Sequence, residues 1–188
     1  DRAAGQAGVA IGAADDESAG RIDVPVAVLG DRQAFQRLAD TGLRLNALHT
    51  VSEIQTFLVE EATELSGGER VMLILEEKTS EFLKNSEVFR RVVVESILPL
   101  PSYQSGKGYE KAEDPQDVLK RIGKYLDQAR QTRTVQLLLP KKSGLHRIIA
   151  PLIAQNQVIG YLYVDMDSLY GTFDDTDRDM LGMLANQA

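Results

Sequence analysis

The chain has 188 residues, of which 43% are hydrophobic and 26% charged, and these proportions are those of a folded globular protein. The formal net charge of −7 disfavours nucleic acid and anionic membrane surfaces as partners. The lack of cysteine excludes disulfides, thiolate metal sites and cysteine nucleophiles, and with the lack of a membrane-spanning apolar run it favours a cytoplasmic protein.

The first 31 residues are predicted to form an N-terminal extension, and residues 32–188 a single domain. Residues 1–20 are rich in alanine, glycine and acidic residues without a sustained period, which is typical of a linker. A short apolar stretch follows at Val24–Leu29, and it could add an edge strand to the domain.

A long helical pattern begins near Arg32. Gly42 is expected to kink this helix or divide it in two, and Ser66, Gly67 and Gly68 are expected to end it as a C-terminal cap. The apolar residues that recur at spacings of three and four are Phe35, Leu38, Leu45, Leu48, Val51, Ile54, Leu58, Ala62 and Leu65.

Two strands and a long loop are predicted next. Val71–Leu75 is a continuous apolar run typical of a buried strand, and Arg91–Leu98 is rich in β-branched residues. Pro99 and Pro101 end the second run, because proline donates no backbone hydrogen bond. The segment 79–91 fits neither pattern, and Leu100–Glu113 is predicted to be a loop.

A second helix is predicted to start at Asp114 and Pro115, since aspartate caps free backbone amides and proline suits the first helical turn. Thr134–Leu139 is predicted to be a short strand. The apolar face of this helix comprises Val118, Leu119, Ile122, Tyr125, Leu126 and Ala129.

The C-terminal part has the clearest pattern. Arg147–Ile153 and Val158–Asp165 are two β-branched runs separated by four residues, which predicts a hairpin. A last helix is predicted from Asp174, with Asp177 placed to complete its N-terminal cap. Within the hairpin, Gly160 indicates a bulge or the close approach of another backbone or ligand. Pro151 indicates an edge, a bulge or a loop beside its strand.

These elements predict an α+β fold with a mostly antiparallel sheet. The hairpin, together with Phe173 and the acidic start of the last helix, resembles the C-terminal half of a GAF domain. The junction Leu65–Val71 is similar to the first helix-to-strand junction of that family. The resemblance covers roughly residues 40–188, although 77–145 match only in the order of their elements.

The resemblance implies a PAS-related fold, with the N- and C-terminal helices on one sheet face and loops and a short helix on the other. It also implies a regulatory or sensory domain cut from a larger, bacterial signalling protein, and no enzyme. Such a domain binds a small molecule, dimerises, or does both, here as a homodimer through the Leu45–Leu65 helix and the C-terminal helix. The alternative is a ligand-free dimerisation or scaffold module.

Several ligands of the family fit this sequence poorly. Members that link a bilin covalently, and members that reduce methionine sulfoxide, use cysteines, which are absent. Members that bind cyclic nucleotides carry Asn-Lys after the last strand, then Phe, then Asp-Glu. Here Met166 and Asp167 stand in place of Asn-Lys and Arg178 in place of the glutamate, so a cyclic nucleotide is disfavoured. The ligand and any cofactor remain unknown at this stage.

Five residues are candidates for ligand binding. Tyr103 and Tyr109 lie on the long loop, where aromatic side chains with a polar tip suit a lid over a small molecule. Arg133 and Arg147 could meet an anionic ligand, and His146 could reach the family's pocket as a haem or metal ligand. The ordinary alternatives are loop packing for the tyrosines, pairing with acidic residues for the arginines, and a surface position for the histidine.

No metal site is predicted. Neither His49 nor His146 has a second histidine or a carboxylate at a spacing that makes a convincing metal site. The acidic residues between 165 and 179 lack the glycine turn and the terminal glutamate of a calcium loop, and they are interpreted as helix caps and a solvated face.

Overall fold

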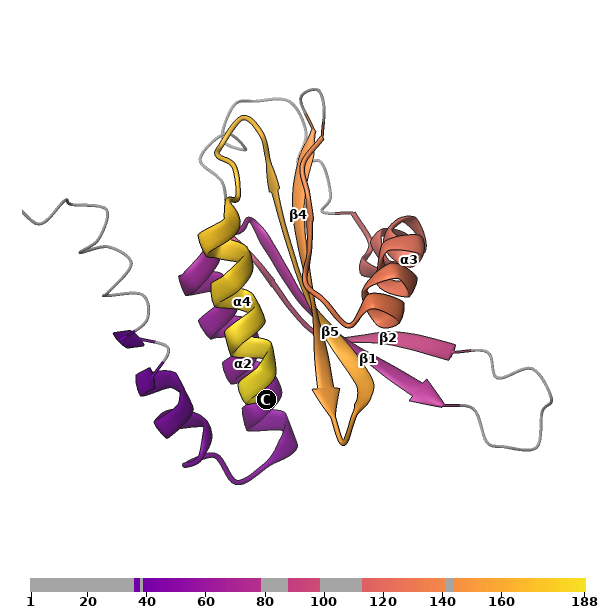
Figure 1. Ribbon diagram of the computed structural model, residues 1–188. Helices are drawn as coiled ribbons and strands as arrows, with labels where there is room; N and C mark the ends of the chain where they lie inside the picture. The colour runs from indigo at the N-terminus through magenta and orange to yellow at the C-terminus, as the bar shows by residue number, and fades with distance from the viewer. Residues whose placement is uncertain (1–35, 38, 79–87, 99–112, 141–143) are drawn as a thin grey trace, which may run out of the picture.

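A computed structural model of the chain describes residues 36–37, 39–78, 88–98, 113–140 and 144–188 (Figure 1). From α2 to the last helix, α4, the order of helices and strands agrees with the prediction. They are α2 (Val51–Ser66), β1 (Arg70–Lys78), β2 (Val88–Ile97), α3 (Pro115–Thr132), β3 (Gln136–Leu138), β4 (Leu145–Ala154), β5 (Gln157–Asp167) and α4 (Asp175–Gln187). The predicted strand at Val24–Leu29 lies outside the described residues.

The five strands form one sheet in the order β2-β1-β5-β4-β3, and every pair of neighbours is antiparallel. The predicted C-terminal hairpin is confirmed as β4 and β5. Gln155 and Asn156 join these strands with positive φ angles of 50° and 62°, which is the backbone of a tight hairpin turn. The fold is therefore α+β, as predicted.

Helices cover both faces of the sheet (Figure 1). Helices α2 and α4 pack side by side on one face, and α3 packs alone on the other. This is the predicted arrangement, with an 18-residue α3 as the helix of the second face. Within the described residues, no helix is both long and apolar enough to cross a membrane.

The predicted opening helix is divided at a different place from the one expected. Residues 36–37 and 39–45 are helical, and Gly42 lies inside this segment without interrupting it. The break falls at residues 46–50, because Thr50 and Glu53 form a capping box that starts α2 anew. The end of α2 was predicted correctly, since Gly67 takes the left-handed conformation (φ 61°) at the C-cap.

Two unusual strand residues have structural reasons. A side chain on Gly160 would collide with the carbonyl oxygen of Ile74, so the close backbone approach predicted there is confirmed. Pro151 lies on β4 beyond Ile149, the last residue of β4 that pairs with β3. Its missing amide therefore falls where β4 has no β3 partner.

Two apolar clusters hold the layers together. The cluster under α2 and α4 includes Phe57, Leu58, Ala62, Leu73, Ile148, Leu162, Val164, Phe173, Leu181 and Leu184. The cluster under α3 includes Met72, Ile74, Val118, Ile122, Leu126, Ala129, Ile149, Tyr161 and Tyr163. Burial of this apolar surface supplies most of the driving force for the three-layer fold.

Candidate functional site

The sheet face under α3 carries charged side chains as well as apolar ones. Cross-strand register puts Arg70, Asp165 and Arg147 in one row across β1, β5 and β4. Partners in an antiparallel ladder share a face, as do alternate residues of one strand. Because Met72 and Tyr163 pack in the cluster under α3, the neighbouring row of charges lies on the same face.

We name the charged end of this face, next to the start of α3, the polar cluster; it comprises Arg70, Glu95, Arg147, Tyr163 and Asp165. Asp165 is only 5% exposed, and the Tyr163 hydroxyl donates to its Oδ2 over 2.7 Å. Burial raises the pKa of the Asp165 carboxyl, although this hydrogen bond and the positive charges of Arg70 and Arg147 oppose the rise. The carboxyl therefore takes up a proton more readily than an exposed aspartate does.

Tyr163 stays a neutral hydrogen-bond donor at physiological pH. Burial raises the pKa of its hydroxyl far above the ordinary value, and the nearby negative charge of Asp165 adds to the rise. A phenol in this state orients a carboxylate and does not act as a base.

Glu95 connects the polar cluster to a hollow at the edge of the sheet. Its Oε1 lies 3.2 Å from Arg70 Nε, and burial, opposed by this cation, raises its pKa. The hollow has a volume of about 300 Å³ and lies between β2 and the first residues of α3. Its lining residues are Val92, Val93, Val94, Glu95, Asp114, Pro115 and Gln116.

Three buried polar atoms in and beside the polar cluster have no hydrogen-bond partner among the described residues. They are Glu95 Oε1, Arg147 Nε and Glu69 Oε1. Glu95 Oε1 is within ion-pair distance of Arg70, but the pair lacks hydrogen-bond geometry. Buried polar atoms are nearly always hydrogen-bonded, so three exceptions so close together call for an explanation.

The start of α3 is fastened over the polar cluster. Arg70 Nη2 donates to the carbonyl oxygen of Glu113 over 3.0 Å, and Arg121 forms a bidentate pair with the Glu113 carboxylate at 2.6 and 2.7 Å. Asp114 caps the helix by accepting from the amide of Gln116. The start of α3 therefore covers the polar cluster, and both backbone and side-chain contacts hold it there.

The opposite end of the same face carries a second group of charges, which we name the α3 clamp: Glu76, Arg90, Asp127, Arg130 and Tyr161. Glu76 accepts from the Tyr161 hydroxyl at 2.5 Å and from Arg90 Nε at 3.1 Å, and it lies 3.5 Å from Arg130 Nε. Arg90 also donates to Asp127 over 2.6 Å. Burial and the hydrogen bond to Glu76 raise the pKa of Tyr161. No atom of the clamp is among the buried atoms without partners.

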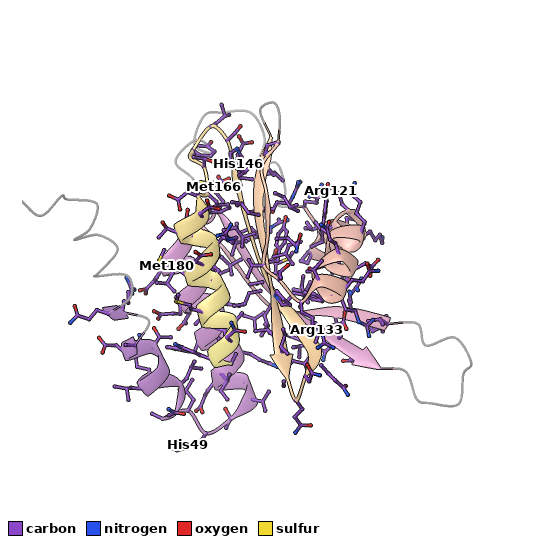
Figure 2. All side chains as sticks on the ribbon, in the orientation of Figure 1. His49, Arg121, Arg133, His146, Met166 and Met180 are labelled. Carbon is purple, nitrogen blue, oxygen red and sulfur yellow. The ribbon has the colours of Figure 1, made fainter. Side chains whose placement is uncertain are left out.

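The predicted site residues are not all brought together. Arg147 lies in the polar cluster. Its neighbour His146 points to the opposite face, where it pairs with Met166 across the strands and its Nδ1 lies 2.9 Å from Thr172 Oγ1. Figure 2 shows His146 beside Met166, with Arg121 and Arg133 toward opposite ends of α3.

Tyr103 and Tyr109, the two candidates on the long loop, lie outside the described residues.

Arg133 lies far from the polar cluster, in the left-handed C-cap position of α3. Its Nη1 donates to Asn156 Oδ1 over 2.5 Å. It also lines an open hollow of about 510 Å³ between α4 and the residues that precede β3. The other lining residues are Thr134, Val135, Arg178, Asp179, Gly182, Met183 and Asn186. Arg178, across this hollow, is already paired with Asp175 and Asp179.

The histidines take part in no metal-binding cluster that the structure describes. Among the described residues, no group of three or more His, Asp or Glu side chains is placed to hold a metal ion. The backbone amide of His49 donates to Glu53 Oε2 as part of the start of α2.

Sequence reasoning missed most of the polar cluster. Arg70 and Asp165 stand at the ends of apolar runs, where they were interpreted as strand boundaries, and Glu95 lies inside the predicted strand Arg91–Leu98. The available signal was period two for Arg70 and Asp165, which lie two positions from the buried Met72 and Tyr163 on the same face. Glu95 lacks this signal, because the register shift in β1 and β2 interrupts the alternation before it. Only the cross-strand register shows that they meet.

Comparison with known proteins gives a family match. The family model described as GAF domain matches residues 51–188, which include all elements from α2 to α4. No curated protein matches the chain.

Solved structures agree in fold. One is the GAF domain of a putative sensor histidine kinase from Pseudomonas syringae pv. tomato, with 15% identity, a TM-score of 0.53 and 86% of each chain covered. Another is the GAF domain of an Acinetobacter phosphoenolpyruvate-protein phosphotransferase, with 13% identity, a TM-score of 0.52, and 87% of this chain and 91% of that one covered. A methyl-accepting chemotaxis protein fragment has 18% identity and a TM-score of 0.51, over 78% and 91% of the two chains.

Proposed function

The chain belongs to the GAF domain family, and from this premise we propose that it is a regulatory or sensory module of a larger signal-transduction protein. The names of the similar structures, a sensor histidine kinase and a chemotaxis protein, support this role. The module acts without catalysis of its own, by passing a change in its own state to an output domain. A cytoplasmic location agrees with the cysteine-free composition, and the net charge of −7 argues against contact with nucleic acid or anionic lipid.

The module binds a small molecule at the polar cluster, on the sheet face under α3. The observation that carries this proposal is the group of three buried polar atoms without hydrogen-bond partners, Glu95 Oε1, Arg147 Nε and Glu69 Oε1. A ligand with both donors and acceptors would satisfy them. The adjacent hollow of about 300 Å³ offers such a ligand a way in between β2 and α3.

Arg147 is the residue of the sequence-based candidate set best placed to bind this ligand. Its guanidinium lies in the row with Asp165 and Arg70, and its buried Nε has a free hydrogen-bond direction. Arg133 and His146 lie elsewhere, so they serve as comparison positions for the experiment. Tyr103 and Tyr109 stay predictions.

A ligand-free dimerisation module is the second candidate. It is favoured by the middle of the α3 face, which the protein fills with its own side chains, including Ile122, Leu126 and Tyr161. The dimer would form through α2 and α4, where Val51 is 70% and Met183 41% exposed. Exposed apolar side chains on neighbouring helices suit a helical interface between two copies.

Native mass spectrometry of the purified 188-residue chain, with an absorbance spectrum of the same sample, tests the proposal. We expect a non-covalently bound small molecule that remains in the Arg133→Gln protein and is lost or at least about tenfold reduced in Arg147→Gln. A ligand-free dimer in all three proteins, each with twice the mass of its own chain and no added mass, contradicts ligand binding and supports the second candidate.

A further inference from the structure

A polar contact fastens the N-terminal helical segment to α2. We name this segment, residues 36–37 and 39–45, the strap. The contact centres on Glu61 of α2, whose side chain is only 3% exposed. Thr41, which is 1% exposed, donates its hydroxyl to Glu61 Oε1 over 2.8 Å.

Charge reinforces this contact. Arg44 Nη1 lies 3.4 Å from Glu61 Oε2, and Arg37 Nε lies 3.6 Å from Glu61 Oε1. Arg37 also pairs with Glu64, one turn farther along α2. Two cations on the strap therefore face two carboxylates on α2, and every partner of Glu61 that the structure shows comes from the strap.

Apolar packing adds little to the contact. Leu45 is buried, and the guanidinium of Arg44 lies over the ring of Phe57 at 4.8 Å from its centre. Leu43, by contrast, is 72% exposed. A segment held mostly by hydrogen bonds and charges, with one buried leucine, opens locally at a smaller free-energy difference than an element of the core does.

The strap also reaches the end of the domain's last helix. A Cβ on Gly42 would lie 3.7 Å from the side-chain oxygen of Gln187, so the Gln187 side chain packs against the strap backbone there. Figure 1 shows the C-terminal end of α4 beside the start of α2, on the side where the strap lies. One segment thus touches both helices of the α2 and α4 face.

We infer that the strap is a detachable latch, locked by Glu61, through which the preceding chain acts on the C-terminal end of α4. When it opens, Glu61 loses its partners and Gln187 loses the neighbouring backbone. The chain that leads into residue 36 can bias this equilibrium, because tension or a new contact on the strap acts directly on the latch. The latch is independent of a ligand under α3, so either proposal can fail without the other.

Amide hydrogen exchange of the full 188-residue chain, read by mass spectrometry, tests this inference. In Thr41→Val and in Glu61→Gln we expect at least about tenfold faster exchange at residues 39–45, because each change removes part of a hydrogen bond to a buried charge. Exchange in the last turn of α4 should also speed up, while β4 and β5 keep their wild-type rates.

Two further variants sharpen the test. Glu64→Gln removes an exposed partner of Arg37, 61% accessible, and should change strap exchange by less than about threefold. Gly42→Ala should slow exchange of the strap by about fivefold, because alanine favours the helix and its Cβ would make only an ordinary contact with the Gln187 side chain.

Unchanged strap exchange in both Thr41→Val and Glu61→Gln would overturn the latch. Equal acceleration in β4 and β5 would also overturn it, since Glu61 would then support the core. If Glu61→Gln does not fold, Thr41→Val decides, because its change lies on the strap. Faster amide exchange in the strap without faster exchange in the last turn of α4 would overturn the coupling between the strap and α4.

Discussion

The two charged ends of the α3 face differ in how completely the protein satisfies them. In the α3 clamp, Glu76 meets Tyr161, Arg90 and Arg130, and Arg90 also meets Asp127. In and beside the polar cluster, three buried polar atoms lack hydrogen-bond partners among the described residues.

This difference separates structural charges from candidate binding charges. A buried network whose donors and acceptors are all matched orders the fold and has nothing left to offer a ligand. An incompletely matched network carries a desolvation cost that a ligand can offset. The polar cluster is therefore the place to look for binding, and the clamp is the place to look for stability.

Removal of a clamp charge should have the largest effect on stability. Arg90→Met leaves the buried Glu76 carboxylate, 3% exposed, with one cation fewer, and should lower the free energy of unfolding by about 3 kcal/mol. Urea denaturation measures the change. Arg91→Met, at an adjacent arginine whose pair with Glu77 is 53% exposed on both sides, should stay within about 0.5 kcal/mol. Equal effects at the two positions would show that the clamp does not hold α3.

A change that stabilises α3, which spans the polar cluster and the α3 clamp, should have a smaller effect on the free energy of unfolding and of opposite sign. Gly123 lies in α3 between the polar cluster and the clamp, and a Cβ there would meet no atom within 4 Å. Gly123→Ala should raise the free energy of unfolding by about 1 kcal/mol, since alanine is the better helix former. A midpoint of urea denaturation unchanged from wild type would argue that α3 is not part of the cooperative unit.

Removal of a charge from the polar cluster should barely change stability. Arg147→Gln takes away a guanidinium whose buried Nε has no partner, so desolvation of the arginine offsets much of its attraction to Asp165. We expect a loss of less than about 1 kcal/mol in urea denaturation, alongside the loss of bound ligand described above. A loss as large as that of Arg90→Met would make the two ends equivalent and remove the basis for the comparison.

The smallest effect is a pH dependence that originates in the polar cluster. Burial raises the pKa of Asp165 in the folded protein, so the folded state binds a proton more readily than the unfolded chain. As pH falls through this raised pKa toward the pKa of the unfolded chain, protonation of the Asp165 carboxyl increases the free energy of unfolding. Asp165→Asn has no carboxyl at this position and lacks this increase.

The variant should therefore be less stable relative to wild type at pH 5 than at pH 7. Urea denaturation measures the free energy of unfolding of both proteins at the two pH values. In the difference between the proteins, the contribution of all other titratable groups cancels to first order. A difference that shrinks on acidification would show that Arg70 and Arg147 lower this pKa more than burial raises it.

Much of the fold could be predicted from local patterns. The hairpin of β4 and β5, the capped starts of α3 and α4, and the glycine end of α2 all depend on residues within a few positions of each other. The break before α2 was placed wrongly, because a single glycine disfavours a helix only modestly and Gly42 is accommodated within the segment. The Thr50 and Glu53 capping box, which also has a sequence pattern, was the stronger signal.

The candidate site could be predicted only in part. Arg147 was singled out because it could meet an anionic ligand, but it was grouped with Arg133 and His146. Neighbouring residues of a strand point to opposite faces, so His146 is directed away from Arg147, and Arg133 caps the far end of α3.

By itself, the sequence determined the kind and order of the elements and the family, because helix caps, turns and apolar periods act over a few residues. Only the tertiary structure decided which charges meet. Arg70, Asp165 and Arg147 are up to 95 positions apart, and they share one row because antiparallel register aligned three strands. The tight turn at Gln155 and Asn156 sets the register of β4 with β5, but the register of β1 with β5 joins segments far apart in the sequence and depends on the packing of their apolar faces.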